Sequence, residues 1–196
     1  PRPTERPDTA SGGWRDLLAG FTFLWRTPVL RWLTVLLTVV SFLSLGMTDV
    51  FIFHVRAGLG HGDQAVGIVL GVAGIGIVLS AALVPMLRRT LGFGACWLGS
   101  YVLCGLSVAV FALSGTVPSA AAAALCYTFG MGVAGISSMS LRQAVTPDHL
   151  LGRVTAAFWT LHGSLAPAGA AVLTALVSRF GVRPPLLAAA AVLLAV

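Results

Sequence analysis

The stretch SMSLRQAVTPDHLLGRV, residues 138–154, is a short polar interruption in a chain that is otherwise strongly apolar. It holds two arginines, an aspartate and a histidine, whereas only 9% of the 196 residues are charged and 57% are hydrophobic. A soluble domain carries about 25% charged residues, so this chain has too few charges to cover a water-soluble core. The composition predicts a membrane protein in which residues 138–154 connect two membrane-spanning helices.

Long apolar runs lie on both sides of this stretch, and five of them have 23 to 25 residues. Since a membrane-spanning helix needs about 20 apolar residues, we expect each run to be one span. These runs are 32–55, 65–87, 91–113, 117–141 and 154–177. A sixth run, 184–196, would cover only roughly 20 Å of the ~30 Å bilayer core. We therefore expect an all-α helical bundle of about five complete transmembrane helices plus a truncated sixth, in a fragment of a longer chain.

The residues before the first span differ from it in composition. Residues 1–13 are polar and rich in proline and glycine, which is typical of a linker. Residues 14–28 place apolar side chains at helical spacing, with arginines beside them, so we expect an amphipathic helix lying in the membrane interface. Its apolar side chains are Trp14, Leu17, Leu18, Phe21, Leu24 and Trp25. The alternative is a short soluble helix packed on a neighbouring domain.

Arginine alone supplies the positive charge behind the formal net charge of +6, since the chain has no lysine. The arginines stand singly or in pairs between apolar runs, which favours membrane-edge positions and argues against nucleic-acid binding. If the runs alternate in direction, nine arginines share one side of the membrane: Arg2, Arg6, Arg15, Arg26, Arg31, Arg88, Arg89, Arg142 and Arg153. The other side has Arg56, Arg179 and Arg183. The side with nine is predicted to be cytoplasmic, in a multi-pass protein of the cell membrane.

The polar stretch then fits a tight cytoplasmic hairpin. Arg142 closes the span before it, where a cation suits both a helix C-terminus and the lipid headgroups. Thr146 can cap the next helix, Pro147 suits its first turn, and Asp148 suits the helix dipole there. Arg153 marks the return to the membrane, and Asp148 can partly offset the charge of the two arginines.

Three segments carry a resemblance to a known family. SLRQAVTPDHLLGRV, after a glycine-rich span, resembles the connection between the tenth and eleventh helices of major facilitator superfamily transporters. DLLAGFTFLWRTPVLRWL resembles the lead into helix seven, and LVPMLRRTLGFG resembles the basic loop between helices eight and nine. The likeness covers nearly the whole chain from about Trp14 onward, and it looks closest to the branch of enterobactin exporters and macrolide efflux pumps.

The resemblance implies the C-terminal six-helix half of a transporter, whose partner is an N-terminal six-helix half and which works by alternating access. It also implies proton-coupled efflux of a small, partly hydrophobic compound, such as a drug or a siderophore, across the lipid bilayer. The sequence around Pro167 is similar to the glycine–proline motif of antiporters. Alternating access needs no covalent chemistry, so we expect neither enzymatic activity nor a cofactor. Two alternatives stay open, a standalone six-span scaffold or assembly module and an intramembrane hydrolase.

The basic loop departs from the family pattern in one respect. Arg88 and Arg89 have no acidic neighbour within the loop, although the superfamily often carries an acid there. Anchoring to anionic lipid is therefore expected for them rather than a charge-paired gate. Arg88 and Arg89, together with Arg142, Asp148 and Arg153, are predicted either to form a cytoplasmic gate or to set the membrane topology.

Asp49 is the leading candidate for transport chemistry. It lies in the first apolar run, roughly 10 Å outward of the membrane midplane at 1.5 Å per residue, where an acid is usually buried in the bundle or faces water. It shares a polar helical sector of about 140° with Thr34, Thr38, Ser41, Ser44 and Thr48. We interpret this stripe as a cavity wall, with Asp49 coupling protons or binding a cationic substrate. The alternative is a structural acid.

His162, in the fifth run, is the second candidate. It lies roughly 5 Å inward of the midplane by the same count and could carry a proton near neutral pH. The alternative is a neutral imidazole that bonds across helices. Trp159 could stack on a flat substrate or face lipid. Because the depths of His162 and Asp49 differ by roughly 15 Å, we do not expect a direct pair.

Several other patterns are discounted. GMGVAG, with Gly130, Gly132 and Gly135, matches a nucleotide-binding pattern but lies within a span, so we expect its glycines to let helices approach. Gly67 and Gly71 are interpreted in the same way. The three cysteines stand in apolar runs without a CxxC pair, and no spaced histidines suggest a metal site.

Overall fold

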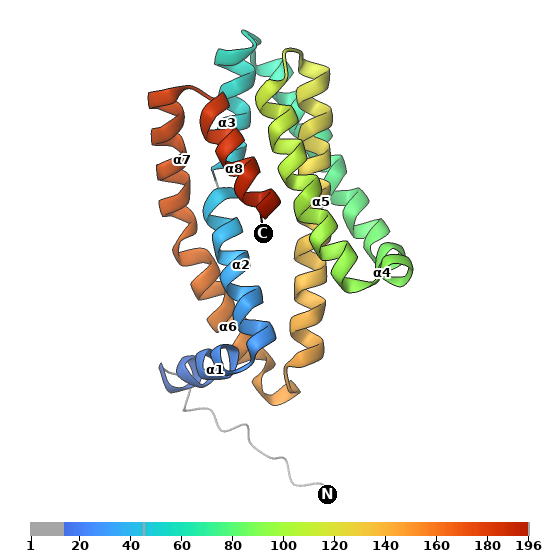
Figure 1. Cartoon of the computed structure of the whole chain (residues 1–196), viewed down its shortest axis with the longest axis vertical. Coiled ribbons are helices and arrows are strands. Elements are labelled where there is room, and N and C mark those ends of the chain that lie inside the picture. Colours follow the sequence, from blue (N-terminus) through green and yellow to red (C-terminus); the bar gives the residue numbers. More distant parts are fainter. Residues whose placement is uncertain (1–13, 45, 196) are drawn as a thin grey trace, which may run out of the picture.

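The computed structural model describes residues 14–44 and 46–195, and every regular element among them is helical. In chain order they are α1 (Trp14–Arg26), α2 (Pro28–Ser44), α3 (Met47–Phe53), the π-helix η1 (His54–Gly58), α4 (Asp63–Leu113), α5 (Val117–Val145), α6 (Asp148–Ser164), α7 (Ala166–Phe180) and α8 (Arg183–Ala195). They form an elongated bundle with α1 lying across one end (Figure 1). The predicted all-α fold is confirmed.

Helix α4 contains two of the predicted spans. Its backbone is helical except at Gly92, where φ is 79° and ψ is 171°. Glycine adopts a positive φ without steric cost, so the chain turns sharply there and the second arm returns toward the end at which α4 begins (Figure 1). The turn at Gly92 lies at the start of the predicted run 91–113, just after the run 65–87.

Two other predicted spans are broken helices. The run 32–55 is divided between α2 and α3 near Gly46, whereas the sequence predicts one continuous helix there. The run 154–177 is divided between α6 and α7 at Leu165. Pro167 lies in the first turn of α7, as the predicted kink at this proline requires.

Among the described residues, four helical stretches are long and apolar enough to cross a membrane when each broken helix is taken as one. They are Pro28–Gly58, Asp63–Leu113, Val117–Val145 and Asp148–Phe180. Because Asp63–Leu113 has two arms, the bundle has five long crossings. The sixth apolar run forms α8, which is shorter.

Helix α5 packs against α4 more extensively than any other pair of elements, and small residues make this possible. Gly76 lies against the Leu125 carbonyl, and the hydroxyl of Thr128 donates to the Ala73 carbonyl at 2.6 Å. A Cβ at Gly130 would lie 2.7 Å from Cys104 Sγ. The predicted close approach at Gly130 is therefore confirmed.

The same prediction fails at other glycines. A Cβ added at Gly67, Gly71 or Gly135 would meet no atom within 4 Å. The sequence pattern cannot distinguish these positions from Gly76, because the contact depends on how the helix is rotated about its axis.

Helices α2 and α7 cross at two glycines. A Cβ on Gly169 would collide with the carbonyl oxygen of Phe42, and one on Gly46 would lie 3.1 Å from Ala170 Cα. Only glycine allows backbones to approach this closely. The crossing brings the break between α2 and α3 beside the start of α7.

Helix α1 packs against α6 and α2. Gly20 lies directly against the backbone carbonyl of Arg153. The side chains of Leu18, Phe21 and Trp25 are exposed, and the last two stack with ring centroids 5.7 Å apart. An apolar face on a helix that crosses the end of the bundle (Figure 1) is the arrangement an interfacial helix needs. Its place in the membrane interface stays a prediction.

Candidate functional site

Two predicted site residues, Ser41 of α2 and His162 of α6, are in hydrogen-bond contact. Ser41 Oγ and His162 Nε2 are 3.0 Å apart in a partly buried position, and His162 Nδ1 is buried without a partner. The tautomer with its proton on Nε2 fits best, because a proton on Nδ1 would be a buried donor without an acceptor. The imidazole therefore ties α2 to α6 by donating to the Ser41 hydroxyl.

Aromatic rings surround this histidine. The ring of Phe158 stacks on that of His162, with centroids 5.2 Å apart and planes inclined by 18°. Trp159 meets the imidazole edge-on at 5.3 Å and is 55% exposed. Its exposed ring is compatible with either predicted role, lipid contact or stacking on a substrate.

Breaking the Ser41–His162 hydrogen bond tests whether it couples the two helices. In a double-mutant cycle of Ser41→Ala and His162→Phe, we expect a coupling free energy of about 0.5–1.5 kcal/mol in unfolding. The measurement is thermal or denaturant unfolding of the purified protein in detergent. Ser41→Ala combined with Thr160→Ala is the control, because the exposed Thr160 hydroxyl donates to the Ala156 carbonyl of its own helix. If the changes in unfolding free energy are additive in the Ser41–His162 cycle as well as in the control cycle, the proposed coupling of the two helices is contradicted.

Arg142 is buried inside the bundle. Its side chain is 3% exposed, and its guanidinium carbon lies 3.5 Å from the centroid of the Phe158 ring. Nε and Nη1 are buried without hydrogen-bond partners. The predicted headgroup contact is therefore wrong for this arginine, since α5 turns its side chain toward α6. Phe158 thus contacts both Arg142 and His162, a cluster that the sequence analysis missed.

Thr146 also differs from its predicted role. It ends α5, and its backbone N–H donates to the Arg142 carbonyl at 3.1 Å. Helix α6 begins at Asp148 and has no side-chain cap, while the Thr146 hydroxyl is buried without a partner. Pro147 occupies the N-cap position of α6, so Thr146 does not cap this helix.

Asp49, in the first turn of α3, has an exposed side chain at the edge of a pocket. The pocket has a volume of about 280 Å³ and lies between α3 and α7. Its other lining residues are Val50, Phe53, Thr174, Val177 and Ser178. Arg56 pairs with Asp63 at 2.7 Å, and no ion pair joins Asp49 to a cation of the described residues. The carboxylate faces a mainly apolar concavity with two hydroxyls.

The predicted polar stripe is interrupted by the helix break near Gly46, and its role as a cavity wall stays a prediction. Thr34 is buried, and its hydroxyl donates to the Leu30 carbonyl at 2.7 Å. Ser41 points to His162, whereas Thr48 and Asp49 are exposed beyond the helix break. In the α2 part of the stripe, Thr34 and Ser41 bond within the bundle, whereas the Ser44 hydroxyl is buried without a partner among the described residues. In the α3 part, Asp49 lines the pocket.

The remaining candidates lie at the ends of helices. Arg88 is half-buried, with its guanidinium carbon 6.0 Å from the Phe93 ring, and Arg89 is exposed. Asp148 and Arg153 are exposed on α6. Asp148 forms no ion pair with the buried Arg142 in the described part of the chain, so it does not offset that charge by direct contact.

His54 is a further polar contact that sequence reasoning did not anticipate. It begins the π-helix η1 and is 5% exposed. Its Nε2 lies 3.2 Å from the Ser114 hydroxyl, and its ring packs on Phe111 at 5.2 Å. The histidine joins the end of α3 to the α4–α5 connection and so fixes the end of the bundle beyond the Asp49 pocket.

Comparison with known proteins agrees with this architecture. A model of the Major Facilitator Superfamily matches residues 1–171. No curated protein and no solved structure matches the chain. The family match covers 171 of the 196 residues, and the apolar helices form the multi-pass bundle that such a transporter needs. The chain therefore belongs to the major facilitator superfamily of membrane transporters.

Proposed function

We propose that the protein exports a small, partly hydrophobic compound by alternating access, driven by proton entry. The chain would act as the C-terminal six-helix half and would need an N-terminal half to complete the substrate cavity. The likeness to enterobactin exporters and macrolide efflux pumps favours export, and the arginine distribution favours a cytoplasmic start in the cell membrane.

The Asp49 pocket is the observation that carries this proposal. A pocket of about 280 Å³ is slightly smaller than the ~300–1,000 Å³ typical of small-molecule sites, as expected of one wall of a cavity shared by two halves. Its lining combines apolar side chains with the Thr174 and Ser178 hydroxyls and one carboxylate. Such a surface suits a partly hydrophobic substrate, and the unpaired carboxylate of Asp49 can take up and release a proton.

The broken helices suit the required movement. Near Gly46, α2 and α3 separate where α7 begins, and α6 and α7 separate at Leu165. Adjacent helix breaks near the substrate site recur in secondary transporters, and the few residues at a break can absorb changes in backbone angle. The His162–Ser41 bond lies on the α2–α6 side of these breaks and the Asp49 pocket on the α3–α7 side. The two halves of each broken helix therefore carry different polar groups.

A vesicle assay tests the coupling to protons. The intact protein is reconstituted in proteoliposomes and offered a panel of small apolar and amphipathic compounds, with and without an imposed pH gradient. We expect the gradient to drive accumulation of at least one compound, and a protonophore to abolish that accumulation. Transport that ignores both the gradient and the protonophore would contradict proton coupling. The complete absence of transport across the panel would contradict the substrate class.

A further inference from the structure

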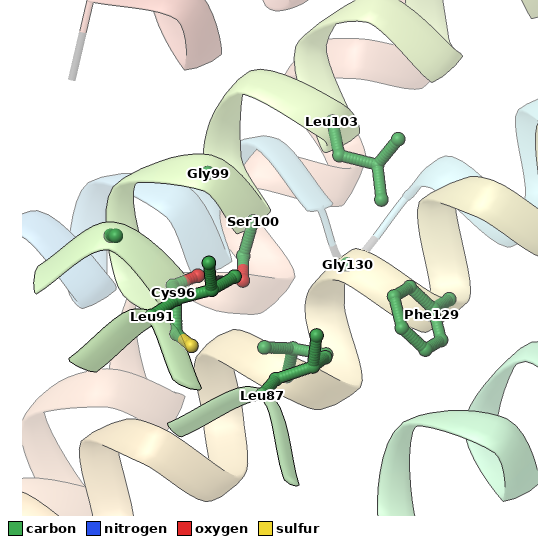
Figure 2. Close-up of a pocket in the computed structure, with 10 residues that line it drawn as sticks. Leu87, Leu91, Cys96, Gly99, Ser100, Leu103, Phe129 and Gly130 are labelled. Carbon is green, nitrogen blue, oxygen red and sulfur yellow. Dashed lines mark hydrogen bonds between the residues drawn. The ribbon is translucent and has the colours of Figure 1, made fainter. Parts of the chain in front are cut away.

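A small apolar groove lies between the second arm of α4 and its neighbours, the first arm and α5 (Figure 2). Its volume is about 140 Å³, well below the ~300–1,000 Å³ of a pocket for a drug-sized molecule. Leu87 and Phe129 lie across the groove from Leu103 (Figure 2). The groove is therefore suited to part of a narrow apolar chain rather than to a whole compact ligand.

One face of the second arm forms the length of the groove. Ala95, Gly99 and Leu103 line it at a spacing of four residues, and Leu91 lines it just before the Gly92 turn. At 1.5 Å per residue the Ala95–Leu103 face extends for about 12 Å into the bundle. The small side chains of Ala95 and Gly99 leave this space open, and Gly130 lines it from α5.

The groove offers no free polar group to a ligand. Its polar lining side chains are those of Cys96 and Ser100. The Ser100 hydroxyl already donates to the Cys96 carbonyl of the same helix, and a cysteine thiol is only a weak hydrogen-bond donor. An occupant inside the groove would be held by apolar contact, and any polar recognition must take place at its end.

Two arginines stand at that end. Leu87 and Leu91 both line the groove, and Arg88 and Arg89 lie between them at the Gly92 turn. Arg89 is exposed and Arg88 half-buried over Phe93, and no carboxylate of the described residues pairs with either. A hydrocarbon groove thus begins beside two positive charges that lack an anion.

We propose that this groove and turn bind an anionic phospholipid. One acyl chain lies along the Ala95–Leu103 face, and the phosphate contacts the guanidinium groups of Arg88 and Arg89. Basic sites at the ends of transmembrane helices favour anionic headgroups in this way, and arginine matches phosphate geometry well. The ligand is a membrane lipid and not a free anion, because the groove whose lining residues Leu87 and Leu91 flank the two arginines in the chain is apolar. The site does not depend on the proposed transport function.

Lipid retention measured by native mass spectrometry tests the site. The intact protein is purified, delipidated, and incubated with phosphatidylglycerol or phosphatidylcholine of the same acyl composition. We expect the first phosphatidylglycerol molecule to bind about tenfold or more tightly than phosphatidylcholine, and the Arg88→Gln/Arg89→Gln double variant to lose this preference. Arg179→Gln is the matched control, since Arg179 also lies beside a phenylalanine ring, at 5.4 Å. Arg88→Lys/Arg89→Lys should retain most of the preference.

A second variant tests the groove itself. Gly99→Leu would place a side chain in the groove, and Gly94→Leu is its control on the same helix. A Cβ at either glycine meets no atom within 4 Å, so neither leucine clashes at its first side-chain atom, but of the two only Gly99 lines the groove. Gly99→Leu should weaken phosphatidylglycerol binding severalfold, and Gly94→Leu should not. Equal binding by all the variants, or inorganic phosphate competing as well as the lipid, would overturn the proposal.

Discussion

Asp49→Asn is expected to abolish proton-driven export and to leave the helical fold unchanged. The asparagine side chain keeps the size of aspartate but cannot take up or release a proton. Asp49 is exposed and pairs with no described cation, so the change should alter the free energy of unfolding by no more than about 0.5 kcal/mol. The two readouts are gradient-driven transport in proteoliposomes and thermal unfolding in detergent.

Two matched variants separate chemistry from structure in this experiment. Asp49→Glu keeps the carboxylate and should retain part of the activity. Asp63→Asn removes an exposed acid that pairs with Arg56 and lies outside the Asp49 pocket, so it should leave transport unchanged. If Asp49→Asn transports like the unaltered protein, Asp49 is a structural acid and proton coupling must be sought at His162.

The helical fold could be predicted from the sequence because the length of the apolar runs and the positions of glycine and proline agree with the helices that form. Apolar runs of span length fix the number of crossings. Gly92 turns the chain with a positive φ, and Pro167 breaks the helix that holds it. The break near Gly46 has no comparable local signal, since its neighbours are apolar and the glycine acquires its role only from contact with α7.

The candidate site was harder to predict, because it depends on the rotation of each helix. Ser41 and His162 were both identified, but their contact joins residues 121 positions apart, which no periodicity reveals. Arg142 was assigned to the headgroups because arginines at span ends usually lie there. Its burial follows from the packing of α5 against α6, which points the guanidinium at Phe158. A sequence shows which residues are polar, but the packing decides which of them face one another.

The Arg142–Phe158–His162 cluster places a buried positive charge on the α5–α6 side of the bundle, and no carboxylate of the described residues pairs with it. An unpaired buried charge is costly, and stacking on the face of an aromatic ring offsets only part of that cost. The donors left without partners, Nε and Nη1, lie in the guanidinium plane and remain unsatisfied. This end of the bundle is thus less completely stabilised than the glycine-packed α4–α5 contact, which suits a region that moves when the transporter changes state.

Gly169→Ala in α7 is expected to destabilise the protein, and to do so far more than Gly163→Ala in α6. The added Cβ collides with the Phe42 carbonyl, which belongs to the last turn of α2, where the backbone oxygens have no partner within the helix. Backbone atoms cannot rotate away as a side chain can, so α2 and α7 must separate. Overpacking of this kind costs about 1–3 kcal/mol or more in the free energy of unfolding.

Thermal unfolding of the purified protein in detergent measures this cost, with Gly163→Ala as the matched control. A Cβ at Gly163 of α6 meets no atom within 4 Å, so alanine there should stabilise its helix by up to about 1 kcal/mol through helix propensity. The two substitutions add the same atom to neighbouring helices, and opposite shifts in melting temperature are expected. Equal shifts would show that the close crossing of α2 and α7 is not a constraint, and would remove the structural reason for the helix break beside the Asp49 pocket.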